Sequence, residues 1–294
     1  MRYDISLTID YSYERPSDHA RCLLHLLPLN IPGLQQVSAS LLTIDPVPLQ
    51  RWDGFDFFGN MATWVVFPDT LSGYRMTLKT QVNRLPPPAQ MDLSASLGSL
   101  FRDISAVNSL APDVPHHFMG PSSRVSLDAA MTTFAQEVTS PEMSVLTVVQ
   151  TVGKALHDHM EFDDSATDVE TSPADAFVAR RGVCQDFTHI MIACLRGIGV
   201  PAGYVSGFLR TVPPPGQKRL EGADAMHAWV RAWCGAEMGW VEYDPTNAIM
   251  AGDGHVTIAY GRDYSDISPV RGILRSSGSH DTEHFVDVIP VAEV

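Results

Sequence analysis

The sequence lacks the motifs that mark several common enzyme classes. It has no G-x-G-x-x-G fingerprint, no phosphate-binding glycine loop followed by Lys-Ser/Thr, and no G-x-S-x-G nucleophile motif. Its four cysteines, Cys22, Cys184, Cys194 and Cys234, form no C-x-x-C pair, which excludes the usual zinc-knuckle and thioredoxin patterns. The sequence therefore predicts no cofactor and no metal centre.

Basic residues and long apolar runs are also scarce. Lys and Arg number 20 against 34 Asp and Glu, and the resulting formal net charge of −14 repels nucleic acid and anionic lipid. No apolar stretch approaches the roughly 20 residues that span a bilayer. The first residues show no basic region followed by an apolar core. We expect a cytoplasmic protein that binds neither nucleic acid nor membranes.

The chain has enough apolar material to build ordinary cores, since 45 % of its 294 residues are hydrophobic. A chain of this length suggests about two domains. The stiff Leu-Pro-Pro-Pro segment at 85–88 is the best candidate boundary. We therefore predict an N-terminal domain at 1–88 and a second domain at 89–294.

The first domain has the pattern of β structure. Runs rich in β-branched and aromatic residues alternate with Pro, Gly, Asp and Asn. They cover 1–13, 21–29, 35–44, 52–58, 61–67 and 74–82. Short strands at near-regular spacing favour an antiparallel, sandwich-like domain.

The second domain mixes helices and strands. Helical patterns cover 127–138, with Ser126 as the N-cap, then 143–160 and 174–180. Strand patterns follow at 202–211, 226–234, 240–244, 255–261 and 285–289. A proline-rich segment at 213–218 is interpreted as a surface hairpin loop, with a lid as the alternative. The predicted class is α+β, in which helices pack on an antiparallel sheet.

The most informative segment is Arg-Gly-Val-Cys-Gln-Asp-Phe at 181–187. Apolar residues recur at helical spacing from Phe187 to Ile198, and Cys184 heads the same stripe. This pattern predicts a buried helix that begins at Cys184. The unpaired N–H groups and the positive dipole end at a helix start favour the thiolate, which is the nucleophilic form. An inert core cysteine is the alternative.

Two later residues are possible partners for this thiol. The segments 224–234 and 240–244 alternate like strands and predict a hairpin. A four-residue loop at 234–237 would set His227 opposite Asp244, with Cβ atoms about 5 Å apart. A carboxylate there would orient the imidazole and stabilise its charged form. Singly, His227 fits a half-buried strand position and Asp244 fits a turn before proline, but the three residues together favour catalysis.

These motifs resemble the transglutaminase-like superfamily, and more narrowly its bacterial members with a β-rich N-terminal domain. The resemblance rests on Gly-Val-Cys at 182–184, His-Ala-Trp-Val at 227–230 and Asp-Pro-Thr-Asn at 244–247. It implies a papain-like core of helices on an antiparallel sheet. By this resemblance, Cys184 is the nucleophile, His227 the base and Asp244 the orienting acid.

The resemblance implies thiol acyl transfer on peptide, protein or small amide substrates, and we expect a cysteine peptidase or amidase. A protein-glutamine transamidase, a catalytically silent peptide-binding module and a Cys/His/Asp metal site are the alternatives. Further substrate or oxyanion contacts are predicted at Gln185, Asp186 and Trp229. Helix capping is the alternative for Asp186, and a core position is the alternative for Trp229.

Overall fold

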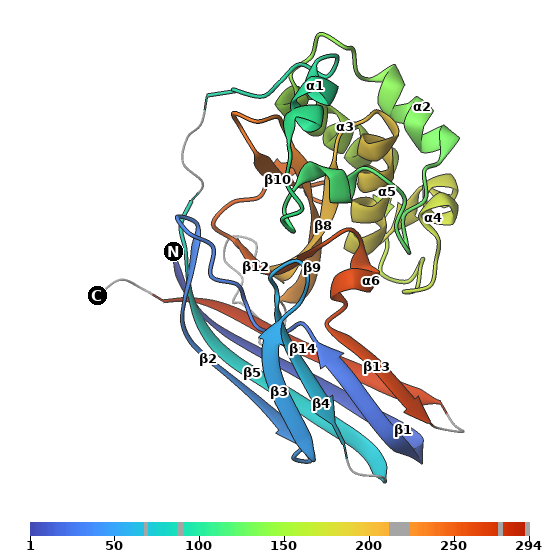
Figure 1. The fold of residues 1–294 in the computed structure, drawn as a ribbon. Helices are drawn as coiled ribbons and strands as arrows, with labels where there is room; N and C mark the ends of the chain where they lie inside the picture. Colours follow the sequence, from blue (N-terminus) through green and yellow to red (C-terminus); the bar gives the residue numbers. More distant parts are fainter. Residues whose placement is uncertain (68–69, 87–90, 212–223, 276–278, 292–294) are drawn as a thin grey trace, which may run out of the picture.

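The computed structural model describes residues 1–67, 70–86, 91–211, 224–275 and 279–291. It has the predicted α+β class: a five-stranded sheet lies between a group of helices and a layer of long N-terminal strands (Figure 1). The loop predicted at 213–218 lies outside the described residues, and so does part of the boundary predicted at 85–88. The division at residue 88 therefore stays a prediction.

The N-terminal sheet is built on one long strand, β1. Alternate residues from Tyr3 to Ile9 are buried, so one face of this strand packs in the core. Its first half pairs with β5 and β14 and its second half with β4 and β13, all antiparallel. The runs predicted as separate strands at 1–13 and 21–29 are thus joined in one strand. The N-terminal strands are β1 (Arg2–Leu24), β2 (Gln35–Asp45), β3 (Gln50–Phe55), β4 (Met61–Val66) and β5 (Leu71–Arg84).

Most helices lie between residues 100 and 197, and one short helix follows at 264–267. They are α1 (Leu100–Ala106), the 3-10 helix η1 (Pro115–Phe118), α2 (Ala129–Glu137), α3 (Val145–His159), α4 (Pro173–Ala179), α5 (Cys184–Gly197) and α6 (Tyr264–Ile267). Asp128, rather than the predicted Ser126, caps α2, because its carboxylate accepts from two backbone N–H groups of the first turn. Within the described chain, no helix is long and apolar enough to cross a membrane.

The strands of the second domain form an antiparallel sheet in the order β11-β10-β9-β8-β12. Its strands are β8 (Ala202–Leu209), β9 (Ala225–Trp233), β10 (Trp240–Asp244), β11 (Ile249–Met250) and β12 (His255–Gly261), and a separate parallel pair is formed by β6 (Glu161–Phe162) and β7 (Arg181–Gly182). Helix α5 packs against β8 and β9 and is flanked by α2, α3 and α4. Its residues from Asp186 to Arg196 are all buried, so the predicted central helix beginning at Cys184 is confirmed.

The β9–β10 hairpin differs from the predicted register by two residues. Trp240 pairs with Trp233, so the loop is 234–239 and not 234–237. Continuing this register sets Asp244 opposite Trp229, with His227 as its diagonal neighbour. Because side chains alternate along a strand, a two-residue shift keeps His227 and Asp244 on the same face. The predicted cross-strand partner was wrong, but the predicted face was right.

Amide side chains attach the N-terminal region to the five-stranded sheet. The Asn60 side chain donates to the Tyr260 carbonyl and accepts from the Tyr260 N–H, both at 2.8 Å. The Gln35 side chain likewise donates to the Thr257 carbonyl at 2.7 Å and accepts from the Thr257 N–H at 2.9 Å. Both partners lie on β12, so the two amides supply hydrogen bonds along this edge strand and hold it in place.

The end of the described chain returns to the N-terminal sheet. Strands β13 (Val270–Arg275) and β14 (His280–Val291) pair with β1. The sequence prediction assigned this region to the second domain. The structure therefore builds the N-terminal sheet from both ends of the sequence, which no local pattern reveals.

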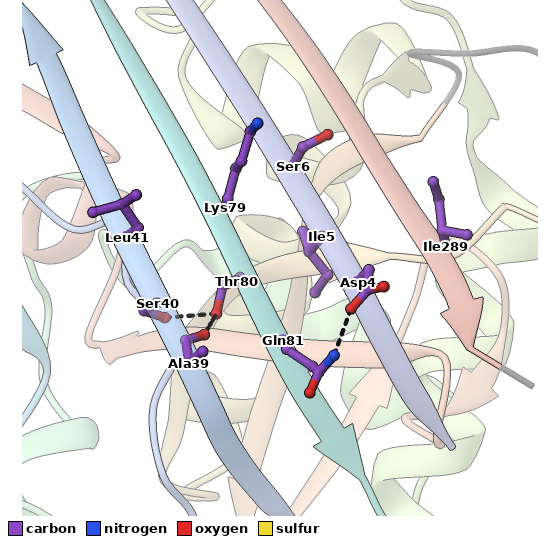
Figure 2. A pocket seen from close by; sticks show the side chains of 10 residues that line it. All are labelled: Asp4, Ile5, Ser6, Ala39, Ser40, Leu41, Lys79, Thr80, Gln81 and Ile289. Carbon is purple, nitrogen blue, oxygen red and sulfur yellow. Dashed lines mark hydrogen bonds between the residues drawn. The ribbon is translucent and has the colours of Figure 1, made fainter. Parts of the chain in front are cut away.

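A shallow hollow of about 510 Å³ lies on the N-terminal sheet (Figure 2). Four of its polar side chains pair across the strands: Gln81 donates to Asp4 at 2.8 Å, and the Ser40 and Thr80 hydroxyls lie 2.6 Å apart. None of Cys184, His227 and Asp244 lines it. This hollow is therefore separate from the predicted active site.

Gly153, in α3, is expected to be intolerant of alanine. In an ordinary helix interior, Gly→Ala stabilises by about 0.5–1 kcal/mol. Here a β-carbon would overlap the ring of Tyr243 on β10, and such overpacking costs about 1–3 kcal/mol. We expect Gly153→Ala to lower the midpoint of denaturant unfolding. The double variant with Tyr243→Leu should regain part of the loss, and an unchanged or raised midpoint in the single variant would contradict the close packing.

Candidate active site

Cys184 is the first residue of α5 and is partly exposed. The chain reaches it through Gly182 and Val183, and the Asp186 carboxylate folds back to accept from the Val183 N–H at 2.8 Å. This capping interaction fixes the first turn of the helix. The unpaired N–H groups and the positive dipole end at a helix start stabilise a negative charge on a side chain placed there.

His227 and Asp244 lie in direct contact. His227 Nε2 is 2.8 Å from Asp244 Oδ2, which is the hydrogen bond that the sequence predicted. The other ring nitrogen, Nδ1, remains for Cys184, whose thiol interacts with this imidazole. The structure thus brings all three predicted residues together from α5, β9 and β10. It does so even though Cys184 and His227 are 43 positions apart in the sequence.

The Asp244 carboxylate is completely buried and accepts five hydrogen bonds. Besides His227, the donors to Oδ2 are Asn247 Nδ2 at 2.7 Å and His255 Nε2 at 3.2 Å. Oδ1 accepts from the backbone N–H groups of Thr246 and Asn247 at 2.9 and 3.2 Å. The Asp-Pro-Thr-Asn turn therefore holds the carboxylate from its own backbone, and the histidines approach from outside.

His255 is a member of this cluster that the sequence analysis missed. It begins β12 and is buried, and its Nδ1 accepts from the Gly252 N–H at 3.2 Å. With Nδ1 accepting, Nε2 is the nitrogen that donates to Asp244, so His255 supports the carboxylate. Its position depends on sheet pairing alone, and we find no local signal in the sequence that could have identified it.

Trp229 forms the wall behind the histidines. It is fully buried, and its ring centroid lies 6.1 Å from that of His227 and 5.1 Å from that of His255. Its indole N–H donates to Glu242 at 2.8 Å. A β-carbon on Gly207 would overlap the indole, so this glycine makes room for it. These contacts match the core position that was the alternative for Trp229.

The other two predicted contact residues, Gln185 and Asp186, belong to the first turn of α5. Asp186 is buried, and its carboxylate accepts from the Thr167 hydroxyl at 2.6 Å as well as from Val183. These are the contacts of a helix cap, which was the alternative for this residue. Gln185 is partly exposed, and its amide nitrogen lies 3.4 Å from the Val169 carbonyl.

The electrostatics of the cluster favour a charged imidazole. Burial alone would lower the pKa of His227, but hydrogen bonds to Asp244 and Cys184 and their negative charges raise it to about 10. Burial alone would raise the pKa of Asp244, but the bonds from His227 and His255 hold it well below its usual range. At neutral pH the pair is therefore an imidazolium and a carboxylate.

The same cluster is the one place where a metal ion is geometrically conceivable among the described residues. The ligand atoms of His227, Asp244 and His255 lie within 4.8 Å of one another. Both histidine Nε2 atoms already hydrogen-bond to the same carboxylate oxygen. A bound cation would have to replace both of these protons. This group differs from the Cys/His/Asp metal site that the sequence left as an alternative, because it contains His255 and not Cys184.

Two family models match this chain. Residues 132–245 match the core of the transglutaminase-like superfamily, and residues 3–83 match the bacterial transglutaminase-like N-terminal region. The first segment contains Cys184, His227 and Asp244, and the second covers nearly all of β1 to β5.

Two mycobacterial proteins and one solved structure are similar to the chain. An uncharacterised protein of Mycobacterium tuberculosis is 31% identical over 263 residues, which cover 87% of this chain and 82% of that protein. An uncharacterised protein of Mycobacterium leprae is 37% identical over 134 residues, 45% of this chain and 46% of that protein. The structure of a candidate cysteine protease from Cytophaga hutchinsonii has a TM-score of 0.74 at 18% identity, covering 100% of this chain and 92% of that chain. That likeness shows a common fold over the length of this chain.

Cys184 is expected to react with iodoacetamide at least about tenfold faster than the other thiols at neutral pH. It is partly exposed at a helix start beside an imidazolium, whereas Cys22, Cys194 and Cys234 are buried. Burial raises the pKa of Cys22, and it raises those of Cys194 and Cys234 to about 12. Brief labelling followed by mass spectrometry measures the four rates. His227→Gln should slow Cys184 selectively, and uniform labelling of the folded protein would refute this assignment.

The free energy of unfolding is expected to fall at alkaline pH, because His227 loses its proton there. Its stabilising contribution is fully present below the pKa of an unfolded histidine, about 6.5, and is lost as pH rises through its folded value of about 10. The Asp244 contribution is present above about pH 3.9 and is lost as pH falls through its lowered folded pKa. Melting temperatures of wild type and His227→Gln, taken from about pH 5 to about pH 10, should converge as pH rises. A constant difference across that range would contradict the raised pKa.

Proposed function

Because the chain belongs to the transglutaminase-like superfamily, we propose that it is a thiol acyl-transfer enzyme of the cysteine peptidase or amidase type. Cys184 is the nucleophile, His227 exchanges the proton and Asp244 orients His227. The fold implies protein or peptide substrates. A cytoplasmic location and the absence of nucleic-acid and membrane partners stay predictions from the sequence.

One observation carries the proposal. His227 links the cysteine at the start of α5 to a fully buried carboxylate through the 2.8 Å bond between Nε2 and Oδ2. A half-buried histidine with a merely structural role would not need a carboxylate that five donors keep ionised. This arrangement of thiol, imidazole and carboxylate supports the division of roles found in catalytic triads.

The acylation step follows from these charges. The Cys184 thiolate attacks the carbonyl carbon of the substrate, and the carbonyl oxygen becomes an oxyanion. The backbone N–H of Cys184 at the helix start is a donor to that oxyanion. The C–N bond then breaks while protonated His227 gives its proton to the leaving amine, which leaves a thioester on Cys184 and a neutral imidazole.

In deacylation, His227 accepts a proton instead of donating one. Neutral His227 takes a proton from water as the water oxygen attacks the thioester carbonyl. Collapse of the second tetrahedral intermediate releases a carboxylic acid and restores the thiolate and imidazolium pair. A primary amine in place of water would give a new amide, which is the transamidase reaction. Throughout, Asp244 remains ionised, because its hydrogen bonds keep its pKa low.

Variants of the three residues should separate catalysis from folding. Cys184→Ser and His227→Gln should each lower turnover at least about a hundredfold, because groups that act as a unit are strongly non-additive. Asp244→Asn should reduce turnover less, since an amide still orients the ring but stabilises its charge poorly. Turnover on a panel of peptides and amides, with and without a primary amine, measures these effects and distinguishes hydrolysis from transamidation.

Cys194→Ser is the matched control on the same helix. Cys194 is completely buried, so its hydroxyl replacement should lower stability by about 1–3 kcal/mol and leave turnover per folded molecule unchanged. Cys184→Ser should show the opposite pattern, with little change in melting temperature. If Cys184→Ser keeps substantial turnover, the acyl-transfer proposal is wrong. If wild type is inactive on every substrate and Cys184 labels slowly, a silent peptide-binding module is the better description.

A further inference from the structure

A groove of about 780 Å³ lies on the four neighbouring strands β3, β4, β1 and β13 of the N-terminal sheet, in the lower part of Figure 1. None of Cys184, His227 and Asp244 lines it. On these strands the side chains of Cys22 and Val65 are buried in the hydrophobic core. Because side chains alternate along a strand, the residues on either side of these two point outward and line the groove.

The strand pairing aligns the outward side chains in two rows that cross all four strands. The first row, from β3 to β13, is Trp52, Trp64, Leu23 and Arg271. The second row is Gln50, Val66, Arg21 and Ile273. All of these residues line the groove. Since paired strands lie about 4.8 Å apart, each row is about 14 Å long, which matches an extended segment of about four or five residues.

The aromatic end of the groove is open to solvent. Trp52 is 49% exposed, and its ring is parallel to that of Trp64 with centroids 5.9 Å apart. A β-carbon on Gly54 would lie 3.3 Å from the Trp64 ring, so this glycine leaves room for the indole. At the other end, Ile273 is 79% exposed. Exposed apolar side chains gathered on one face and flanked by charges mark interaction sites, and Trp and Arg often dominate their binding energy.

Both charged side chains of the groove are arginines. Arg21 and Arg271 are exposed, so a partner can reach their guanidinium groups. Neither forms an ion pair within the described part of the chain, and Arg271 donates to a neutral acceptor, the Ser265 carbonyl, at 3.3 Å. The two guanidiniums therefore retain donors for an anionic group.

The carboxylates on adjoining elements are already engaged. Asp53 lies on the opposite face of β3 from the tryptophans and accepts from the Thr63 hydroxyl at 2.5 Å. Asp56 and Asp266 share a neighbouring hollow with Arg271, and each accepts several hydrogen bonds from residues close to it in sequence. The groove thus presents positive charge on a chain whose formal net charge is −14.

We propose that this groove docks a short extended segment of a partner protein that combines large apolar side chains with carboxylates. The apolar side chains would lie against Trp52 and Trp64, and the carboxylates would accept charge-assisted hydrogen bonds from Arg21 and Arg271. The charge of the groove selects an acidic segment over a basic one. The proposal does not rest on the triad.

Two other occupants fit the groove less well. A nucleic-acid strand would stack on the tryptophans, but two arginines neutralise few phosphates and the acidic chain repels a polyanion. A second copy of the chain that used the same face would bring the arginines of both copies together. An acidic, apolar protein segment avoids both repulsions.

Isothermal titration calorimetry with acetyl-Leu-Phe-Leu-Glu-Glu-amide tests the groove. The full-length Cys184→Ser protein is used throughout, so that cleavage of the peptide does not disturb the measurement. We expect saturable binding at millimolar concentration or below. The matched peptide with glutamine in place of both glutamates should bind at least about tenfold more weakly, and added salt should weaken binding of the acidic peptide.

Variants of the face and matched controls locate the binding. Trp52→Ala and Arg21→Glu, made in the same protein, should each weaken binding of the acidic peptide at least about tenfold. Phe101→Ala and Arg102→Glu change exposed residues of similar kind on α1 and should bind like the parent protein. Melting curves show which variants are folded. If Trp52→Ala does not fold, Arg21→Glu, which changes an exposed side chain, still decides the test.

Several results would overturn the proposal. They are equal affinity in the folded groove variants and the controls, equal binding of the two peptides, and no saturable binding at millimolar concentration. Tighter binding of a short oligothymidine than of the acidic peptide would identify a nucleic-acid site instead. A dimer in sedimentation that Trp52→Ala or Arg21→Glu converts to monomer would identify a second copy as the occupant.

Discussion

The buried carboxylate of Asp244 is the constraint on which the candidate site depends. A carboxylate without solvent is costly unless donors surround it, and here the turn at 245–247 and two histidines supply five hydrogen bonds. These bonds keep it ionised and thereby hold the neighbouring imidazole in its charged form. The local turn at 245–247 thus helps to determine the charge state of His227 on the adjacent strand.

The architecture around this carboxylate serves to fix three elements relative to one another. The capped first turn of α5 sets the position of Cys184, and the β9–β10 pairing sets that of His227 and Asp244. The N-terminal strands support β12 through Asn60 and Gln35, and β12 carries His255 into contact with Asp244. The N-terminal sheet therefore contributes to the site without supplying any of its three central residues.

Two clusters of buried charge lie along the five-stranded sheet, and they are compensated differently. Around Asp244, the His227 imidazolium and the carboxylate balance each other, and hydrogen-bond donors surround the carboxylate. Around Glu242, the guanidiniums of Arg84 and Arg231 lie near a carboxylate whose oxygens are already bonded to Trp229 and Tyr260, and Asp113 adds a second negative charge near Arg231. Trp229 separates the two clusters, since it contacts His227 on one side and Glu242 on the other.

The sequence by itself determined the features that depend on short-range patterns. Helical spacing after Cys184, strand alternation around His227 and the Asp-Pro-Thr-Asn turn each act over a few residues, so the family, the α+β class and the three central residues could be predicted. The hairpin register was predicted two residues out, because glycine-rich loops accommodate several lengths. Only the tertiary structure decided the contacts of His255 with Asp244, the placement of Arg84 near Glu242 and the return of β13 and β14 to β1. Each of these joins segments that no local periodicity connects, and only the packing of the complete chain brings them together.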